Sequence, residues 1–202
     1  MPTRSLATGL AALLAGALAF SGCGSSTKSV ASIGSQHEGA AALAADARSA
    51  ATGDIPDNQS FLTLHDSRLR VSMLYPEGWT VKTSASGVTI SDKNNLVRIL
   101  VAPGSAPTVS NVRASLAALK SSTPGLTAGT PRTISLASGA AVKAIYTTQS
   151  APNPVTGKQV RLTVDRYELA HGGRVATIDL GTPVGVDNVD AYRRMIESFR
   201  WQ

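Results

Sequence analysis

The chain has 202 residues, of which 43% are hydrophobic, 16% charged and 4% aromatic, and its formal net charge is +6. This length suits one ordinary domain plus an additional segment. The single cysteine excludes an intramolecular disulfide and a cysteine-based zinc site. The modest charge, with no basic run longer than Arg193-Arg194, argues against a nucleic-acid-binding protein.

The N-terminal stretch has the organisation of an export signal. A mostly apolar run over residues 6–20 is too short to span a bilayer, and two small residues then precede Cys23. This arrangement resembles a lipobox, the recognition site of the lipoprotein signal peptidase, although Phe20 stands where leucine is usual. The resemblance implies that residues 1–22 are removed and that Cys23 is acylated. The alternatives are an ordinary signal peptide with an unrelated cysteine and an uncleaved anchor.

Residues 24–60 are rich in Ser, Ala and Gly and contain few large apolar side chains. Such a segment cannot bury enough surface to offset the entropy lost on ordering it. We therefore expect a signal peptide over 1–22, a lipidated Cys23 with a flexible tether over 23–60, and a folded domain over 61–202. As a random coil, the tether would reach about 35 Å from the membrane.

Before the first helix, strands are predicted over residues 61–65, 69–74, 88–91 and 96–102, and a further extended piece starts at Trp79 and Val81. Between the second and third, Tyr75-Pro76-Glu77-Gly78-Trp79 is predicted as a turn, because proline restricts φ and glycine accepts a positive φ. The fourth strand is almost continuously apolar, so we expect it to be central and buried on both faces.

Two amphipathic helices and four more strands complete the prediction. The first helix begins at Thr108 or Ser110 and ends at Pro124-Gly125, and the second is capped by Asp187 and ends near Phe199. The strands lie between the helices, over 132–136, 140–148, 159–170 and 174–181. Because hairpins dominate this order, the sequence predicts an α+β fold with a mainly antiparallel sheet flanked by helices.

Three signatures within residues 61–202 resemble the PsbP-like family, which shares the Mog/PsbP fold. They are the turn Tyr75–Trp79, the central helix over 109–121 between hairpins, and the ending Ile196–Trp201. Bacterial lipoproteins such as LpqN-type proteins also resemble this family. The resemblance implies an α/β/α sandwich that serves as a non-catalytic binding or accessory module, and it assigns no functional residue.

The sequence contains no HExxH, GxSxG, Walker A or dinucleotide-binding motif, and its Ser-x-x-Lys match, from Ser25 to Lys28, lies in the predicted tether. His65 and Asp66 are the nearest candidates for a metal site, but adjacent strand residues face opposite sides, so no metal or cofactor is expected. Asp165 and Asp179 could act as general acid and base if their strands adjoin. We favour the alternative that they pair with neighbouring arginines on a solvated sheet face, namely Arg161, Arg166 or Arg174.

These observations predict a lipoprotein held on the outer face of the cell membrane through Cys23. We expect it to bind an envelope partner or a small apolar ligand. We expect neither catalysis nor binding of nucleic acid. Two alternatives remain open, a cell-envelope hydrolase with an unrecognised site and a structural envelope protein without a ligand. A pocket in which Asp165 and Asp179 converge with a Ser or His would favour the hydrolase.

Overall fold

The computed structural model describes residues 41–45, 48, 52–153 and 155–202. Cys23, the predicted signal peptide and the tether up to residue 40 lie outside the described residues. Within the described part, no helix is both long and apolar enough to cross a membrane. The elements that build the main core lie between Ile55 and Trp201.

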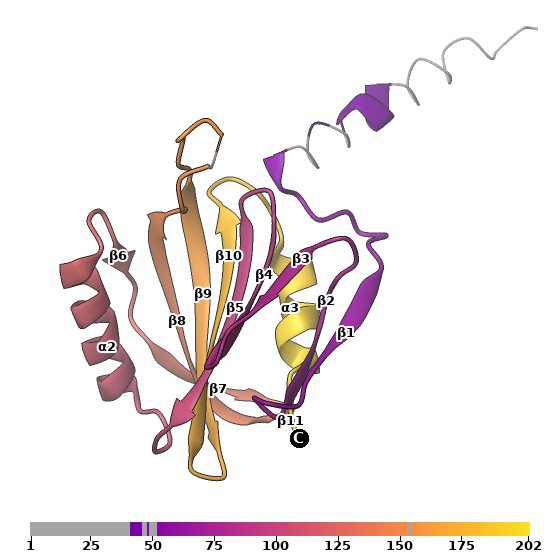
Figure 1. The fold of residues 1–202 in the computed structure, drawn as a ribbon. Helices are drawn as coiled ribbons and strands as arrows, with labels where there is room; N and C mark the ends of the chain where they lie inside the picture. Colours follow the sequence, from indigo (N-terminus) through magenta and orange to yellow (C-terminus); the bar gives the residue numbers. More distant parts are fainter. Residues whose placement is uncertain (1–40, 46–47, 49–51, 154) are drawn as a thin grey trace, which may run out of the picture.

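An antiparallel sheet of eight strands forms the middle layer (Figure 1). Its order is β3-β4-β5-β10-β9-β8-β6, and β7 also pairs with β8. The strands are β3 (Thr80–Thr83), β4 (Gly87–Asp92), β5 (Asn95–Pro103), β6 (Thr127–Ala128), β7 (Arg132–Leu136), β8 (Gly139–Gln149), β9 (Arg161–His171) and β10 (Arg174–Pro183). Tight hairpins join β4 to β5, β7 to β8 and β9 to β10, so neighbours in sequence become neighbours in the sheet.

One face of the large sheet carries the main hydrophobic core. It is covered by helix α3 (Val189–Ser198) and by a small antiparallel sheet of order β1-β2-β11, made of β1 (Phe61–Asp66), β2 (Val71–Pro76) and β11 (Arg200–Trp201). Met73 from β2, Met195 from α3 and Phe199 are each 0% exposed. Their burial supplies the hydrophobic free energy that holds α3 and the small sheet on the large one.

Helix α2 (Val109–Ser122) covers the other face, over β6 and β8. It begins where predicted, because Thr108 Oγ1 accepts a hydrogen bond from Asn111 N at 3.1 Å. Val112 and Leu116 form the buried stripe of α2 and pack with Val142 and Tyr146 of β8. Helical elements thus lie on both faces of one antiparallel sheet, which confirms the predicted α+β class (Figure 1).

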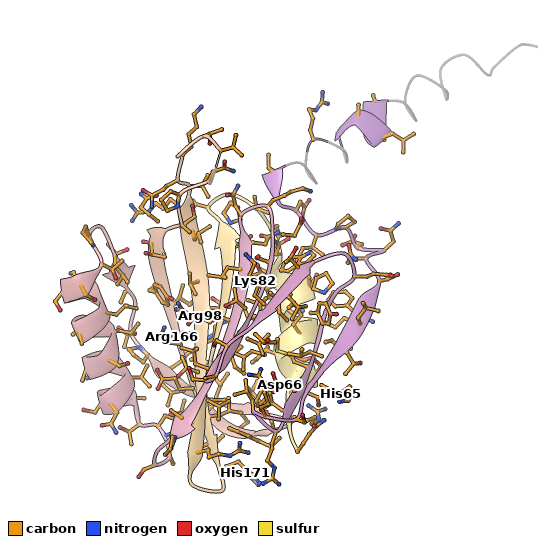
Figure 2. All side chains as sticks on the ribbon, in the orientation of Figure 1. His65, Asp66, Lys82, Arg98, Arg166 and His171 are labelled. Carbon is orange, nitrogen blue, oxygen red and sulfur yellow. The ribbon has the colours of Figure 1, made fainter. Side chains whose placement is uncertain are left out.

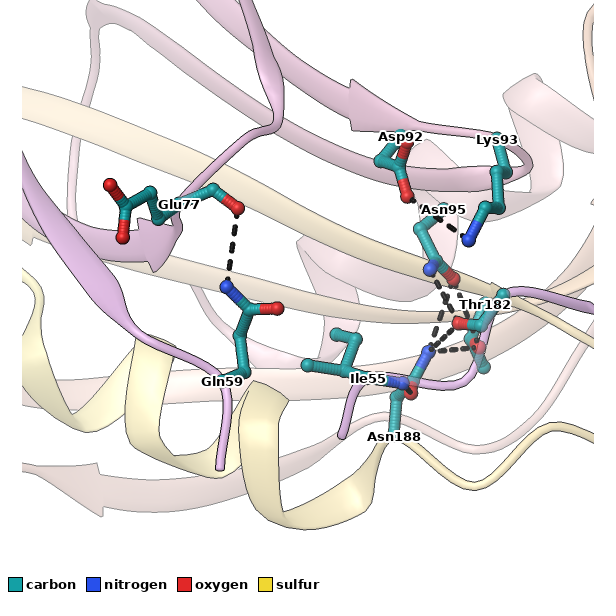
Figure 3. Close-up of polar contacts among 9 residues, drawn as sticks. Ile55, Gln59, Glu77, Asp92, Lys93, Asn95, Thr182 and Asn188 are labelled. Atoms are coloured by element: carbon teal, nitrogen blue, oxygen red, sulfur yellow. Dashed lines mark hydrogen bonds and ion pairs between the residues drawn. The ribbon is translucent and has the colours of Figure 1, made fainter. Parts of the chain in front are cut away.

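The segment that precedes β1 also packs against the domain (Figure 3). The Ile55 side chain is 8% exposed and belongs to the main core, and Ile55 N donates to Asn188 Oδ1 at 2.8 Å. The side-chain amides of Asn95 and Asn188 donate to the Gly53 carbonyl at 2.6 and 3.1 Å. Packing therefore begins at about Gly53, although the composition places residues 53–60 in the tether, because one buried side chain creates no periodic pattern.

Two local predictions differ from the structure. Strand β5 is central, but Leu100 is 38% exposed whereas Ile99 is 0% exposed, so only one face of β5 is fully buried. Helix α3 has its N-cap at Asn188 rather than at Asp187. Asp187 Oδ1 still accepts from Val189 N at 3.2 Å, while the Asn188 side chain is occupied by the contacts that fix the chain at Gly53 and Ile55.

Candidate functional site

A groove of about 560 Å³ opens between helix α3 and the β7–β9 end of the large sheet. Its floor comes from alternate residues of β8, β9 and β10, which point to one face because strand side chains alternate. The apolar part of the lining includes Ile134, Leu136, Ile145, Leu180, Val189 and Ile196. The groove therefore lies on the same face of the sheet as the main core and continues that core to the surface.

Three polar side chains form one contact network on the groove floor. Lys143 Nζ lies 2.6 Å from Asp165 Oδ2, and Tyr167 Oη donates to the same carboxylate oxygen at 3.3 Å. Lys143 Nζ also lies 5.1 Å from the centre of the Tyr167 ring. The Lys143 and Asp165 side chains are 17% and 26% exposed, so both charges remain accessible from the groove.

The protonation states of this network follow from its contacts. Partial burial alone would lower the pKa of Lys143, but hydrogen bonds and opposite charge, chiefly from Asp165, outweigh it and raise that pKa. Burial raises the pKa of Tyr167. Near neutral pH the floor therefore presents a charged Lys143 ammonium group and a protonated Tyr167 phenol beside Asp165. This set can donate and accept hydrogen bonds, but its amine is not poised as a nucleophile.

Exposed apolar side chains mark the mouth of the groove. Ile145 of β8 is 43% exposed and Val189 of α3 is 62% exposed, and both line the groove. Isolated exposed apolar residues are ordinary, but these flank a concave lining that is itself largely apolar. An apolar concavity with a few convergent polar groups is the usual form of a small-ligand site.

A second charged cluster lies on the opposite face of the sheet, where Arg98 and Arg166 stand side by side (Figure 2). Asp179, only 1% exposed, accepts from Arg166 Nε at 2.7 Å and Nη2 at 2.9 Å, and from Arg98 Nη2 at 2.6 Å. Burial would raise the pKa of Asp179, but the hydrogen bonds and charges of the two arginines lower it. Because every oxygen of this carboxylate is occupied by arginine, the cluster joins β5, β9 and β10 rather than forming a binding site.

Solved structures with a similar arrangement include two small proteins. The cyanobacterial PsbP protein (CyanoP) of Synechocystis sp. PCC 6803 is 13% identical, with a TM-score of 0.49 over 74% of this chain and 98% of that one. The Ran-binding protein Mog1p of Saccharomyces cerevisiae is 7% identical, with a TM-score of 0.47 over 70% and 95% of the two chains. Both are similar to this chain in the arrangement of their elements. The likeness, at these identities, concerns the fold alone.

Other comparisons assign no family to this domain. A protein of Bacteroides thetaiotaomicron is similar with 12% identity and a TM-score of 0.45, over 69% of this chain and 48% of that one. No family model matches the chain, and no curated protein matches its sequence.

The fold separates the two carboxylates that the sequence offered as an acid–base pair. Strands β9 and β10 do adjoin, but their register places Asp179 opposite Arg166 and Asp165 opposite Leu180, so the two aspartates point to opposite faces. Asp165 pairs with Lys143, and Asp179 pairs with Arg166 as expected but in a buried cluster rather than on a solvated face.

The histidines also lie apart. His65 is exposed on β1 while Asp66 beside it is buried, and His171 lies at the tip of the β9–β10 hairpin (Figure 2). Over the described ranges, no three His, Cys, Asp or Glu side chains gather in a way that could hold a metal ion. Cys23, the predicted lipidation site, lies outside the described residues.

The sequence reasoning missed Lys143 and Tyr167. Alternation in the strand predicted over 159–170 does place Asp165 and Tyr167 on one face. The sequence does not predict the register of β8 and β9, which places Tyr167 opposite Lys143, because register depends on how distant strands pair.

Proposed function

We propose that this domain is a non-catalytic binding module, and that its groove takes a small amphipathic ligand. The observation that carries the proposal is the groove of about 560 Å³, whose lining is largely apolar and whose floor carries a polar network. Pockets of roughly 300–1,000 Å³ with this composition are typical of small-molecule sites. In this proposal the apolar body of the ligand packs on residues such as Ile145, and one polar group reaches Lys143 and Asp165.

Binding without catalysis agrees with the chemistry of the floor. Lys143 is held as a cation by Asp165, so its amine lacks the free electron pair that a nucleophile or a base requires. The carboxylate of Asp165 already has the Lys143 ammonium group and the Tyr167 hydroxyl as partners. The three groups are therefore assigned to recognition.

The proposed place of action is the outer face of the cell membrane. The lipobox-like sequence before Cys23 supports lipidation there, and the chain reaches the packed domain at Gly53, close to the N-terminal end of α3. To test for this anchor, the full-length protein is extracted from membranes and its mass is measured. Loss of residues 1–22 with a gain of acyl mass, both abolished by Cys23→Ala, is the expected result. An unlipidated protein released to the medium would contradict it.

Ligand binding can be tested with decanol as the probe and backbone amide NMR of the full chain as the readout. We expect signals of Lys143 and Tyr167 to shift on titration. Ile145→Asp should weaken binding at least about tenfold, because the ligand would have to desolvate a carboxylate. Leu62→Asp is the matched control, since Leu62 is also a strand residue and is also 43% exposed, but lies on β1 outside the groove.

The two variants also define failure of the proposal. If decanol leaves the groove signals in place, or if Ile145→Asp and Leu62→Asp bind alike, the groove is not a small-ligand site. An envelope protein would then be the remaining candidate for its occupant.

A further inference from the structure

The charges that line the groove are not balanced locally. The lining contains three cations, Arg132, Lys143 and Arg193, and two carboxylates, Asp165 and Glu197. Lys143 is paired with Asp165 at 2.6 Å, and Arg193 is paired with Asp190 at 2.6 Å. The Arg132 side chain makes no hydrogen bond or ion pair with any of the described residues.

Arg132 is exposed to solvent, and its cross-strand neighbour is a second cation. Arg132 of β7 is the direct cross-strand partner of Lys143 of β8, and both line the groove. Side chains at such positions have Cβ atoms about 4.5–5.5 Å apart, and like charges there destabilise the pair of strands. Asp165 neutralises Lys143 from the far side of β8, on β9, so Arg132 alone remains uncompensated.

Glu197 does not supply the missing charge. It is exposed on α3, one helical turn beyond Arg193, where residues four apart are neighbours of opposite charge. Glu197 therefore has a cation beside it on its own helix, whereas the nearest defined neighbour of Arg132 is another cation. The β7 wall of the groove is consequently the side that would gain from a bound anion.

We propose that the ligand is an acidic amphiphile whose carboxylate or phosphate binds Arg132 beside Lys143, while its hydrocarbon chain lies along the apolar walls. This inference rests on the proposed function, because it specifies the polar group of the same ligand. Ile134 and Leu136 follow Arg132 at alternate positions of β7 and also line the groove. One strand thus offers a cation at one point and a continuous apolar surface beyond it, which matches a head group followed by a chain.

The test compares four probes with the same ten-carbon chain type, namely decanoate, decyl phosphate, decanol and decyltrimethylammonium, titrated into the full chain by amide NMR. We expect either acid to bind about tenfold more tightly than decanol, the gain typical of a charge-assisted contact. The cationic probe should bind most weakly. A preference between decanoate and decyl phosphate then distinguishes a fatty acid from a phospholipid head group as the source.

Substitutions separate charge from shape. Arg132→Gln should remove the advantage of the acids and leave decanol binding unchanged, whereas Arg132→Lys should keep most of it. Arg113→Gln is the control, because it makes the same charge change at an exposed residue of α2, on the opposite face of the sheet. Thermal unfolding midpoints verify that all three variants fold.

Three outcomes distinguish an acidic ligand, a neutral ligand and no ligand in the groove. Loss of the acid preference in Arg132→Gln alone supports the inference. Equal affinity of the wild-type chain for decanol and the acids, or equal behaviour of Arg132→Gln and Arg113→Gln, overturns it while leaving a neutral-ligand groove intact. If none of the four probes shifts the groove signals, the proposed function itself fails.

Discussion

Substitution of the buried Asp179 tests how much its ion pairs with Arg166 and Arg98 stabilise the sheet. Asn at this position keeps the shape of the side chain but removes the charge that faces Arg166, whose side chain is only 9% exposed. Removing one partner of a buried ion pair costs about 3–5 kcal/mol, because the other charge stays buried without compensation. We expect Asp179→Asn to lower the free energy of unfolding by that amount. Arg98→Gln should cost only about 0–1 kcal/mol, since Arg98 is 37% exposed and screened by water.

Urea unfolding of the full chain near neutral pH measures both losses. The pH dependence provides a second readout. Burial opposes ionisation of Asp179, but the contacts of Arg166 and Arg98 depress its pKa below the ordinary value of 3.8. A depressed pKa means that the stabilisation is fully present above the unfolded pKa and is lost as the pH falls through the folded one. The difference in the free energy of unfolding between wild type and Asp179→Asn should therefore be constant near neutral pH and decrease below about pH 4.

A double variant separates charge from packing. Asp179→Leu with Arg166→Met removes the carboxylate and the more deeply buried arginine together, and apolar replacement of a buried pair is often neutral or stabilising. It should therefore recover much of the stability that Asp179→Asn loses. A loss below about 1 kcal/mol for Asp179→Asn, or a gap that does not change on acidification, would refute the argument.

Three further predictions concern single positions. A Cβ at Gly87 would lie 2.8 Å from the Ile99 carbonyl oxygen, so Gly87→Ala should cost about 1–3 kcal/mol in urea unfolding, and an unchanged midpoint would contradict this. Arg70 has a φ of 51°, so Arg70→Gly should raise the thermal midpoint by the equivalent of about 0.5 kcal/mol, and a lower midpoint would count against strain there. Burial, followed by the charge of Asp179, raises the pKa of Tyr146 to about 12. The folded state then holds this proton more tightly than the unfolded one, so stability should fall as the pH rises above 10.0, and ultraviolet titration should show the Tyr146 pKa lowered in Asp179→Asn.

Much of the fold could be predicted from local pattern. The turn at Gly78 and the cap at Thr108 depend on residues close in the chain, and the structure has a positive φ of 89° at the first and a hydrogen bond at the second. The apolar stripe of α3 was likewise readable, since Tyr192, Met195 and Ile196 are buried. Where prediction and structure differ, as at Leu100 and Ile55, burial was decided by what covers the residue from elsewhere in the chain.

The candidate site was much less predictable. Its polar floor joins Lys143 of β8 to Asp165 and Tyr167 of β9, and its wall adds Arg132 of β7. A shift of one residue in strand pairing would turn these side chains to the other face. The register cannot be read from hydrophobic alternation alone when both faces of a strand carry apolar residues.

The amino-acid sequence by itself determined the lipobox-like segment before Cys23, the alternation that forms the strands, and the stripes that form α2 and α3. These properties depend on residues within a few positions of one another, so a short stretch of sequence is enough to predict each of them. Only the tertiary structure decided that Asp165 and Asp179 face opposite sides, and that α3 and β7 enclose a groove with Arg132 unpaired at its wall. Those features arise from pairing and packing between distant segments, whose geometry is selected by burial of the whole core rather than by any single stretch of sequence.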